Sequence, residues 1–207
     1  MKPHTSADIT AVFGMPGMGK STIVRHQVAP RNRVLIHDPA AWPDWGEIAE
    51  PVTGGLELAE RLTDKGPMRI CWRGANGKRT REDAIAAFEL GNEAAVAAGD
   101  LTLVWDEVDR FTAPGSPLPP LAYLIANESR HSRIRLYILA RRPARVNRDL
   151  TSYANRMIVF RTQEPADIKY FRERSAELAE VIPTLPDYHA ADWSVKGGVV
   201  VKKSPFR

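Results

Sequence analysis

The stretch GMPGMGKST, residues 14–22, decides the fold of this chain. It follows the apolar run ITAVF (residues 9–13) and precedes a helical pattern over residues 20–28. The spacing satisfies GxxxxGK[ST], in which glycines let backbone N–H groups turn around phosphate oxygens at a helix N-terminus. We therefore predict a phosphate loop that binds a nucleoside triphosphate, with the lysine on the β- and γ-phosphates and the serine on Mg²⁺. The predicted binding residues are Gly14, Met15, Pro16, Gly17, Met18, Gly19, Lys20, Ser21 and Thr22.

A second acidic site follows the apolar segment LTLVW, where Asp106 and Glu107 stand at a predicted strand end. In phosphate-loop enzymes an Asp in this place holds Mg²⁺, and a following Glu orients or deprotonates the attacking water. We predict these roles for Asp106 and Glu107, and a structural role for Asp109. An Asp-Glu pair favours a hydrolytic motor, because a small-molecule kinase needs no residue that activates water.

Short apolar runs alternate with helical stretches along the whole chain. This alternation predicts a doubly wound α/β fold with a mostly parallel sheet, helices on both faces and a small C-terminal β-hairpin. The hairpin is expected over residues 187–207, around a Gly-Gly turn. The proline-rich segment 112–120 is expected to be a loop. The predicted strands cover residues 9–13, 33–38, 68–73, 101–108, 134–140 and 156–161, and the predicted helices cover residues 20–28, 55–65, 80–98, 119–130 and 164–180.

Composition agrees with one compact domain over residues 1–207. The chain carries a formal net charge of +4, which permits a polyanionic partner without requiring one. Its single cysteine, Cys71, cannot form an internal disulfide and is expected to be a buried core residue in a reducing cytoplasm. The sequence shows no signal peptide and no apolar run long enough to span a membrane.

Further along, the segment RHSRIRLYILARRPARVNRDLTSYANRMIVFRTQEP (residues 130–165) resembles a motif region of the FtsK–HerA superfamily of DNA-pumping ATPases. Within that superfamily, the chain is most similar to the genome-packaging ATPases of tailless, membrane-containing icosahedral viruses and to related phage ATPases. The resemblance includes the phosphate loop, IHDP on the second strand, Asp106-Glu107, the Arg-Arg-Pro element and FRTQEP, and so covers nearly the whole chain.

This resemblance implies a RecA-like ATPase that uses ATP and Mg²⁺ to move double-stranded DNA into a preformed capsid. It also implies a homo-oligomeric ring, a pentamer or hexamer, that meets viral capsid vertex proteins in the host cytoplasm or on the virion. Arg130 falls where the family has an arginine that acts on the neighbouring subunit's nucleotide, and Arg133 and Arg135 are rival candidates. Arg141 occupies a position where the superfamily commonly has a sensor Gln, and we expect it to contact phosphate.

Basic residues after the strand at 68–73 are candidates for DNA contact. Contacts to the phosphate backbone suit a motor that must accept any sequence, while solvated charge at a helix start is the plainer alternative. These candidates are Arg73, Lys78, Arg79 and Arg81. Asp38 lies at the end of a predicted strand, either near the nucleotide or as a loop cap, and His37 is expected to pack within the strand.

Two other functions remain open at this point. One is a small-molecule or nucleoside kinase, and the other is an ATPase for the assembly and export of filamentous phage. Phosphate transfer to a nucleoside would identify the first, whereas stimulation of ATP turnover by long duplex DNA would support the motor.

Overall fold

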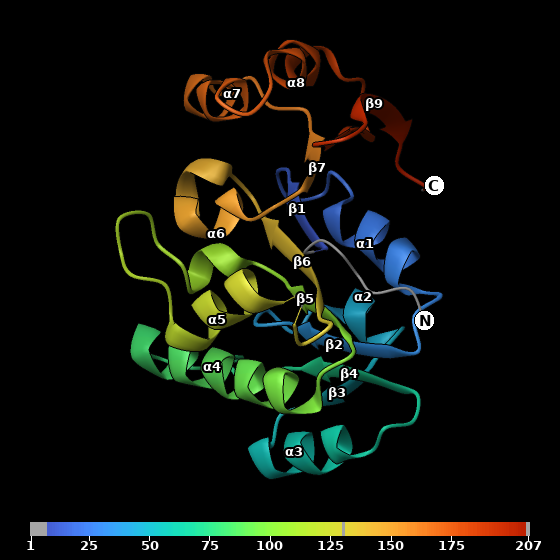
Figure 1. Ribbon diagram of the computed structural model, residues 1–207, viewed down its shortest axis with the longest axis vertical. Helices are drawn as coiled ribbons and strands as arrows, with labels where there is room; N and C mark the ends of the chain where they lie inside the picture. The colour runs from blue at the N-terminus through green and yellow to red at the C-terminus, as the bar shows by residue number, and fades with distance from the viewer. Residues whose placement is uncertain (1–7, 130, 206–207) are drawn as a thin grey trace.

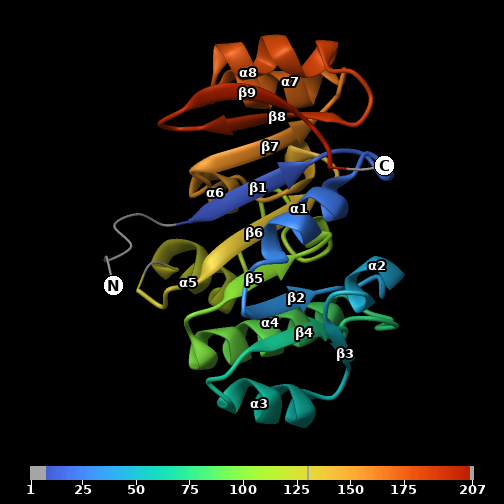
Figure 2. The ribbon, with the colours of Figure 1, turned by 90° about the vertical axis from the view of Figure 1, so that its right-hand side faces the viewer.

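The computed structural model (Figure 1) describes residues 8–129 and 131–205, and its centre is one nine-stranded sheet. The strand order is β3-β4-β2-β5-β6-β1-β7-β8-β9, which Figure 2 shows as a stack from β9 to β3. Strands β1 to β7 pair in parallel, and β8 and β9 are antiparallel. The strands are β1 (Ile9–Phe13), β2 (Arg33–His37), β3 (Glu50–Val52), β4 (Met68–Trp72), β5 (Thr102–Trp105), β6 (Arg135–Ala140), β7 (Arg156–Phe160), β8 (His189–Ser194) and β9 (Gly198–Lys203).

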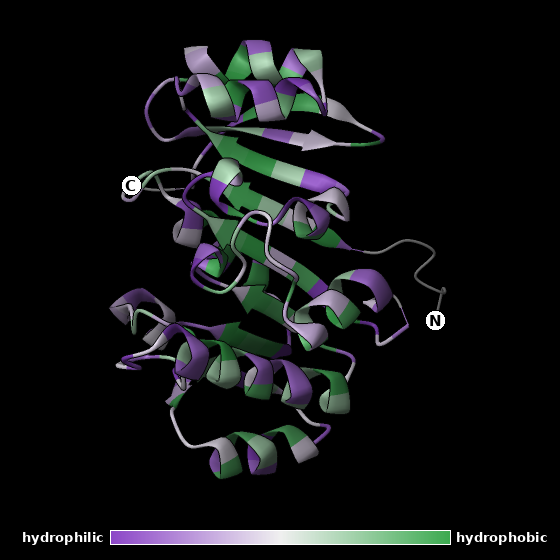
Figure 3. Ribbon diagram, turned by 90° about the vertical axis from the view of Figure 1, so that its left-hand side faces the viewer, coloured by the Kyte–Doolittle hydropathy of each residue, from purple (hydrophilic) through white to green (hydrophobic). Residues whose placement is uncertain are grey.

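Helices cover both faces of the sheet, as the nearly continuous apolar strands require. Alternate residues of β1 face opposite sides: Val12 packs with α1 residues, and Ala11 and Phe13 belong to the larger core on the other face. The hydropathy colouring of Figure 3 shows the strands as a green band between helices of mixed character. The helices are α1 (Lys20–Val28), α2 (Pro43–Gly46), α3 (Gly55–Thr63), α4 (Arg81–Ala98), α5 (Pro120–Glu128), α6 (Arg148–Ser152), α7 (Pro165–Arg172) and α8 (Ala176–Val181).

The two faces are covered unequally. Helices α1 and α2 lie on one side in Figure 1, and α4, α5 and α6 lie on the other. The smaller core contains α1 residues and Trp45 of α2, whereas the larger one includes residues of α3, α4, α5, α7 and α8. This arrangement confirms the doubly wound α/β fold expected from the sequence.

Parallel pairing brings the carboxyl ends of the strands to one edge of the sheet. Strand β1 lies between β6 and β7, and β5 is the next neighbour of β6. The loops that follow β1, β5 and β6 therefore meet at adjacent positions, where ligands bind in open α/β sheets. These loops carry the phosphate loop, Asp106-Glu107 and Arg141.

The predicted C-terminal hairpin is present and extends the main sheet, because β8 pairs antiparallel with β7. Its charged anchor is Asp192, 9% exposed, whose carboxylate accepts hydrogen bonds from Arg156 at 2.7 Å and from Lys202 at 2.7 Å. These bonds lower the pKa of Asp192 against the opposing effect of its burial. The hairpin thus joins the sheet through both backbone pairing and an ionic contact.

Three details differ from the sequence prediction. The strand predicted over 101–108 ends at Trp105, because Glu107 adopts a left-handed backbone conformation and a 3₁₀ turn follows at Val108–Arg110. The single helix predicted over 164–180 is wrong, since α7 ends at Arg172 and Ser175 caps a separate α8 by accepting from Leu178 N. Strand β3 and the short helices α2 and α6 lie in segments for which no element was predicted.

Two predictions about single core residues are confirmed. Cys71 is fully buried, and burial raises the pKa of its thiol to about 12. His37 is 2% exposed beside the Phe88 ring, and burial lowers the pKa of its imidazole to about 3. Within the described residues, no helix is long and apolar enough to cross a membrane.

Candidate active site

The phosphate loop joins β1 to α1, and each of its three glycines is required by backbone conformation or by lack of space. Gly17 and Gly19 have φ values of +79° and +100°, a region that residues with a side chain rarely adopt. Gly14 has an ordinary backbone but no space, because a Cβ there would lie 2.9 Å from Cβ of Phe160. The glycine spacing of the motif thus matches a conformational or steric need at each of the three positions.

The N-terminus of α1 offers unused hydrogen-bond donors to an anion. The first helical bond joins Ile23 N to the carbonyl of Gly19 at 3.0 Å. Within the described part of the chain, no protein acceptor takes the N–H groups of residues 20–22. These donors and the positive end of the helix dipole suit phosphate oxygens.

Lys20 begins α1 and bends back over its own loop. Its Nζ donates to the carbonyl of Met15 across 3.4 Å, a long contact. Burial lowers the pKa of Lys20, and the nearby carboxylate of Asp106 opposes this shift. Phosphate oxygens would give this amino group stronger acceptors than a single carbonyl.

Asp106 follows β5 directly and is 3% exposed. Its Oδ2 accepts a hydrogen bond of 2.7 Å from the indole Nε1 of Trp45, and its Oδ1 accepts one of 2.9 Å from the backbone N of Glu107. Burial raises the pKa of Asp106 to about 6, although the bond from Trp45 works in the opposite direction. Both oxygens are therefore fixed in direction before any ligand binds.

Glu107 stands at the strand-to-turn junction with φ +46°, and its side chain is only 12% exposed. Its Oε1 accepts a hydrogen bond of 3.0 Å from Nη2 of Arg141, and Nε of Arg110 lies 2.6 Å from its Oε2. The hydrogen bond that Arg141 donates to the Glu107 carboxylate raises the pKa of Arg141. Arg141 thus touches the carboxylate predicted to activate water, in addition to lining the same cavity.

One cavity of about 380 Å³ brings the separate sequence motifs together. A hydroxyl and a carboxylate among its lining residues, Ser21 and Asp106, are hard oxygen donors of the kind Mg²⁺ prefers. The residues present thus fit a magnesium ion that accompanies a triphosphate. The cavity is lined by Pro16, Gly17, Gly19, Lys20, Ser21, Thr22, Trp42, Asp44, Asp106, Glu107, Ala140 and Arg141.

The sequence did not single out Arg110, and it left two roles open for Trp42 and Trp45, the packing of a loop or a place near the adenine base. Trp45 is fully buried but bonds Asp106, while Trp42 is 52% exposed at the cavity. The available signal was the pair of tryptophans in DPAAWPDWGE, which follows a strand whose carboxyl end was expected at the site. Arg110 gave a weaker signal, three residues after Glu107 on the turn.

Asp38 and Arg73 bind each other. Asp38 is fully buried, and its Oδ2 accepts a hydrogen bond of 3.0 Å from Nε of Arg73. Its Oδ1 accepts one of 3.1 Å from the backbone N of Trp42, so Asp38 caps the loop that follows β2. The guanidinium of Arg73 also donates to the carbonyl of Trp42 at 2.8 Å. Arg73 therefore stands apart from the other DNA candidates, because its side chain is directed into the protein.

Lys78, Arg79 and Arg81 are exposed on the segment between β4 and the first turn of α4. Strand β4 pairs in parallel with β2, so this segment begins at the same edge of the sheet as the cavity. No ion pair or hydrogen bond to another described residue engages these three side chains. They remain predictions as DNA contacts.

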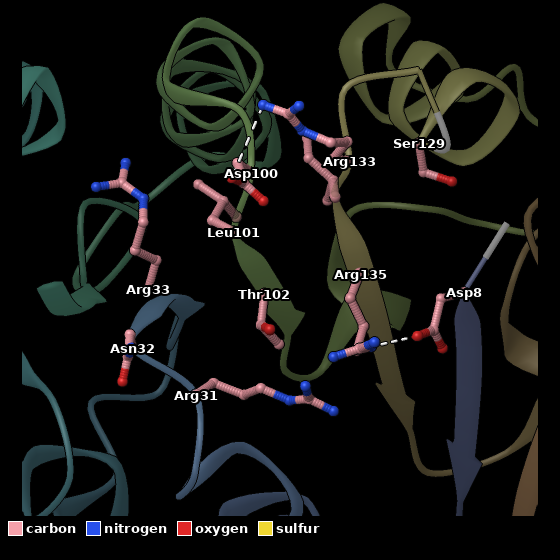
Figure 4. Close-up of a pocket in the computed structure, with 11 residues that line it drawn as sticks. Asp8, Arg31, Asn32, Arg33, Asp100, Leu101, Thr102, Ser129, Arg133 and Arg135 are labelled. Atoms are coloured by element: carbon pink, nitrogen blue, oxygen red, sulfur yellow. Dashed lines mark hydrogen bonds and ion pairs between the residues drawn. The ribbon is translucent and has the colours of Figure 1, made fainter. Parts of the chain in front are cut away.

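Two of the three arginines predicted to act on a neighbouring subunit's nucleotide, Arg133 and Arg135, lie at the opposite, amino edge of the sheet. Figure 4 shows Arg133 and Arg135 before and at the start of β6, together with Arg31 and Arg33 around a pocket of about 440 Å³. Arg135 is paired with Asp8, and Nη2 of Arg133 lies 3.8 Å from Oδ2 of Asp100. Arg130, the first choice from the sequence, lies outside the described residues.

Comparison of the sequence with protein-family models and with curated proteins finds no match. Solved structures do match. One is the DNA-packaging ATPase B204 from Sulfolobus turreted icosahedral virus, with 20% identity, TM-score 0.78 and coverage of 97% of this chain and 99% of that one. Another is the genome-packaging NTPase B204 of Sulfolobus turreted icosahedral virus 2 in complex with ATP-gammaS, with 20% identity, TM-score 0.77 and 100% coverage of both chains.

A more distant match is VirB4 of Thermoanaerobacter pseudethanolicus, with 10% identity, TM-score 0.63 and coverage of 100% of this chain and 91% of that one. At these identities the likeness establishes the fold. It agrees with the doubly wound α/β fold that the sequence predicted.

Proposed function

We propose that this protein is an ATP-hydrolysing motor that moves double-stranded DNA and packages a viral genome into a preformed capsid. The observation that carries the proposal is the single cavity that gathers Lys20, Asp106 and Glu107 at the carboxyl edge of the sheet. Full-length likeness of the fold to B204, whose structures are described as those of a packaging NTPase, supports the choice among phosphate-loop functions.

In the proposed reaction, the γ-phosphoryl group passes from ADP to water within this cavity. The N–H groups of residues 20–22 and the Lys20 amino group hold the phosphates, and Ser21 and Asp106 would hold Mg²⁺. Bound Mg²⁺ supplies neutralisation of the charge on the phosphate oxygens. Glu107 orients water and accepts its proton, once its carboxylate has exchanged at least one arginine contact for that water.

The opposite locations of the cavity and of Arg133 and Arg135 support the proposal of a ring. The cavity is at the carboxyl edge of the sheet, and Arg133 and Arg135 are at the amino edge. Head-to-tail contacts between copies bring the amino edge of one subunit to the cavity of the next, and such contacts form rings when the rotation closes. We propose five or six subunits, with an arginine of the neighbour completing each site.

DNA would bind through the exposed cations on the segment before α4. Lys78, Arg79 and Arg81 can pair with phosphates of any sequence, as a packaging motor requires. Such binding weakens steeply with salt. The proposed setting is the host cytoplasm or the virion, with capsid vertex proteins as the docking partner.

The decisive experiment measures ATP turnover with and without long duplex DNA, together with oligomeric state by light scattering. We expect duplex DNA to stimulate turnover, and Lys20→Ala to abolish turnover with and without DNA. An equal rate of turnover with and without DNA would overturn the motor proposal. Transfer of the γ-phosphate to a nucleoside would identify a kinase instead. Stimulation of turnover by coat protein rather than by DNA would favour the other alternative, an export ATPase.

A further inference from the structure

The segment of residues 38–46 connects the basic loop after β4 with the active-site carboxylate. Here the basic loop means residues 74–81, which carry Lys78, Arg79 and Arg81. The segment begins at Asp38, directly after β2, and ends with helix α2, which contains Trp45. Each of its two ends makes a side-chain contact with another segment, Asp38 with Arg73 and Trp45 with Asp106.

At one end, Arg73 fastens the segment to the start of the basic loop. Arg73 follows β4 directly, so it is the residue from which the basic loop departs. Its Nε donates to Oδ2 of Asp38 at 3.0 Å, and its Nη2 donates to the carbonyl of Trp42 at 2.8 Å. Its side chain is 17% exposed, and that of Asp38 is fully buried. A buried carboxylate needs such a partner, which fixes the position of Arg73 closely.

At the other end, Trp45 holds Asp106. The indole Nε1 donates to Oδ2 of Asp106 at 2.7 Å, and neither side chain is open to solvent. Trp45 packs in the core with Ile36 of β2 and Val104 of β5, so its ring has little freedom. The direction of the Asp106 carboxylate therefore depends on the position of α2.

Together these contacts form a continuous chain from Arg73 through Asp38 and residues 42–45 to Asp106. We infer that Arg73, Asp38 and Trp45 are positioning residues that transmit DNA contact at the basic loop to the magnesium-binding carboxylate. The inference rests on the proposed function, because it gives a route for DNA to stimulate turnover. A bound phosphate backbone that pulls the basic loop acts first on Arg73, and displacement of Arg73 moves the segment that sets Asp106.

Spatial continuity alone does not establish coupling, so the test must measure it directly. The first set of measurements uses no DNA. It compares the affinity for ATP-gammaS with and without Mg²⁺ in Trp45→Phe, which keeps the ring and removes the N–H donor, and in Arg73→Gln. Trp105→Phe is the matched control, since Trp105 is also fully buried and donates from Nε1 to Asn92 at 2.9 Å. Arg69→Gln is the second control, an arginine on the same strand that bonds the carbonyls of Ala29 and Arg31 instead.

We expect the affinity gained from Mg²⁺ to fall by about tenfold or more in both test variants, as for other residues that orient a metal ligand. The affinity of the test variants for ATP-gammaS without Mg²⁺ should stay within about twofold of the parent. The affinity that both controls gain from Mg²⁺ should also stay within about twofold of the parent. Arg73→Lys provides a milder test if Arg73→Gln unfolds, because lysine keeps a charge for Asp38 but cannot also reach Trp42 with a second fixed N–H group. A double variant of Trp45→Phe with Arg73→Lys should lose less than the sum of the two single effects.

The second set of measurements uses duplex DNA. Arg73→Lys should bind duplex DNA within about twofold of the parent in anisotropy titrations, but it should lose most of the DNA stimulation of turnover. Arg79→Gln should lose both the stimulation and affinity for duplex DNA. Weaker DNA binding by Arg73→Lys with an unchanged Mg²⁺ dependence would overturn the inference and make Arg73 a direct contact. The inference would also be overturned if Trp45→Phe gained as much affinity from Mg²⁺ as Trp105→Phe does. If the parent shows no DNA stimulation at all, the motor proposal fails, and the Mg²⁺ measurements still decide whether these residues position Asp106.

Discussion

Replacing Glu107 with Gln should separate ATP binding from hydrolysis in this protein. The amide keeps the shape of the side chain and loses the capacity to accept a proton from water. Loss of a positioned general base typically costs about 10²–10⁴ in rate. Binding of ATP should change by less than about threefold, because the phosphate contacts come from the phosphate loop and Lys20.

The structure also sets the expected effect of this substitution on stability. Glu107 meets two arginines, at 3.0 Å from Arg141 and 2.6 Å from Arg110, but these side chains are 40% and 47% exposed. Ion pairs with such exposed partners contribute only about 0.2–1 kcal/mol each. The left-handed backbone of Glu107 suits Gln no worse than Glu, so the total loss in the free energy of unfolding should remain below about 2 kcal/mol.

Phosphate release measured beside ATP-gammaS binding and urea denaturation tests all three expectations. Asp109→Asn is the matched control, because Asp109 lies on the 3₁₀ turn that directly follows Glu107 and does not line the cavity. It should keep turnover within about threefold of the parent, as an acid outside the proposed transfer path. Turnover of Glu107→Gln within threefold of the parent would remove Glu107 from the mechanism, and parallel loss of ATP binding would show that its charge serves binding instead.

Three further substitutions or conditions give distinct outcomes. Gly19→Ala should lower both the melting temperature and ATP affinity, since φ is +100° and Oγ of Ser204 lies 3.1 Å from the new Cβ; we expect about 1–3 kcal/mol of destabilisation. Gly54→Ala, with φ −87° and no atom nearer than 3.8 Å, is its control and should leave melting unchanged. Phe88→Ala should cost about 3–5 kcal/mol in chemical denaturation, because this buried ring stacks on another at a centroid distance of 4.4 Å. Because the pKa of Asp106 is raised to about 6, protonation of its carboxylate should compete with Mg²⁺ below pH 6. In nucleotide titrations, the affinity measured with Mg²⁺ should therefore fall about tenfold per pH unit below pH 6. The affinity measured without Mg²⁺ should not fall in this way.

Much of the site could be predicted from short motifs because each motif has a local physical cause. In the loop GMPGMGKST, Gly17 and Gly19 serve a local backbone conformation with positive φ, whereas Gly14 leaves space for the distant Phe160. Asp106-Glu107 was recognisable because an apolar strand precedes it, and burial of that strand fixes where the acids emerge. The resemblance through ARRPARVNRDL added Arg141, which indeed stands at the carboxyl end of β6.

What the sequence could not supply were contacts between residues far apart in the chain. Trp45 and Asp106 are separated by 61 positions, and Asp38 and Arg73 by 35, so no periodicity links them. Arg73 was predicted to touch DNA because it is a cation at the start of a basic run. Its contacts depend on the pairing of β2 with β4, which places Asp38 beside it.

By itself, the sequence determined a doubly wound α/β chain with a phosphate loop and two carboxylates at strand ends, because glycine conformations and apolar strands act over a few residues. Only the tertiary structure decided which side chains share the cavity, since strand order is set by packing across the whole sheet. It also decided that Arg141 contacts Glu107, that Trp45 contacts Asp106, and that Arg73 points inward. The physical reason is that these directions follow from burial and charge pairing between distant segments, which local patterns do not encode.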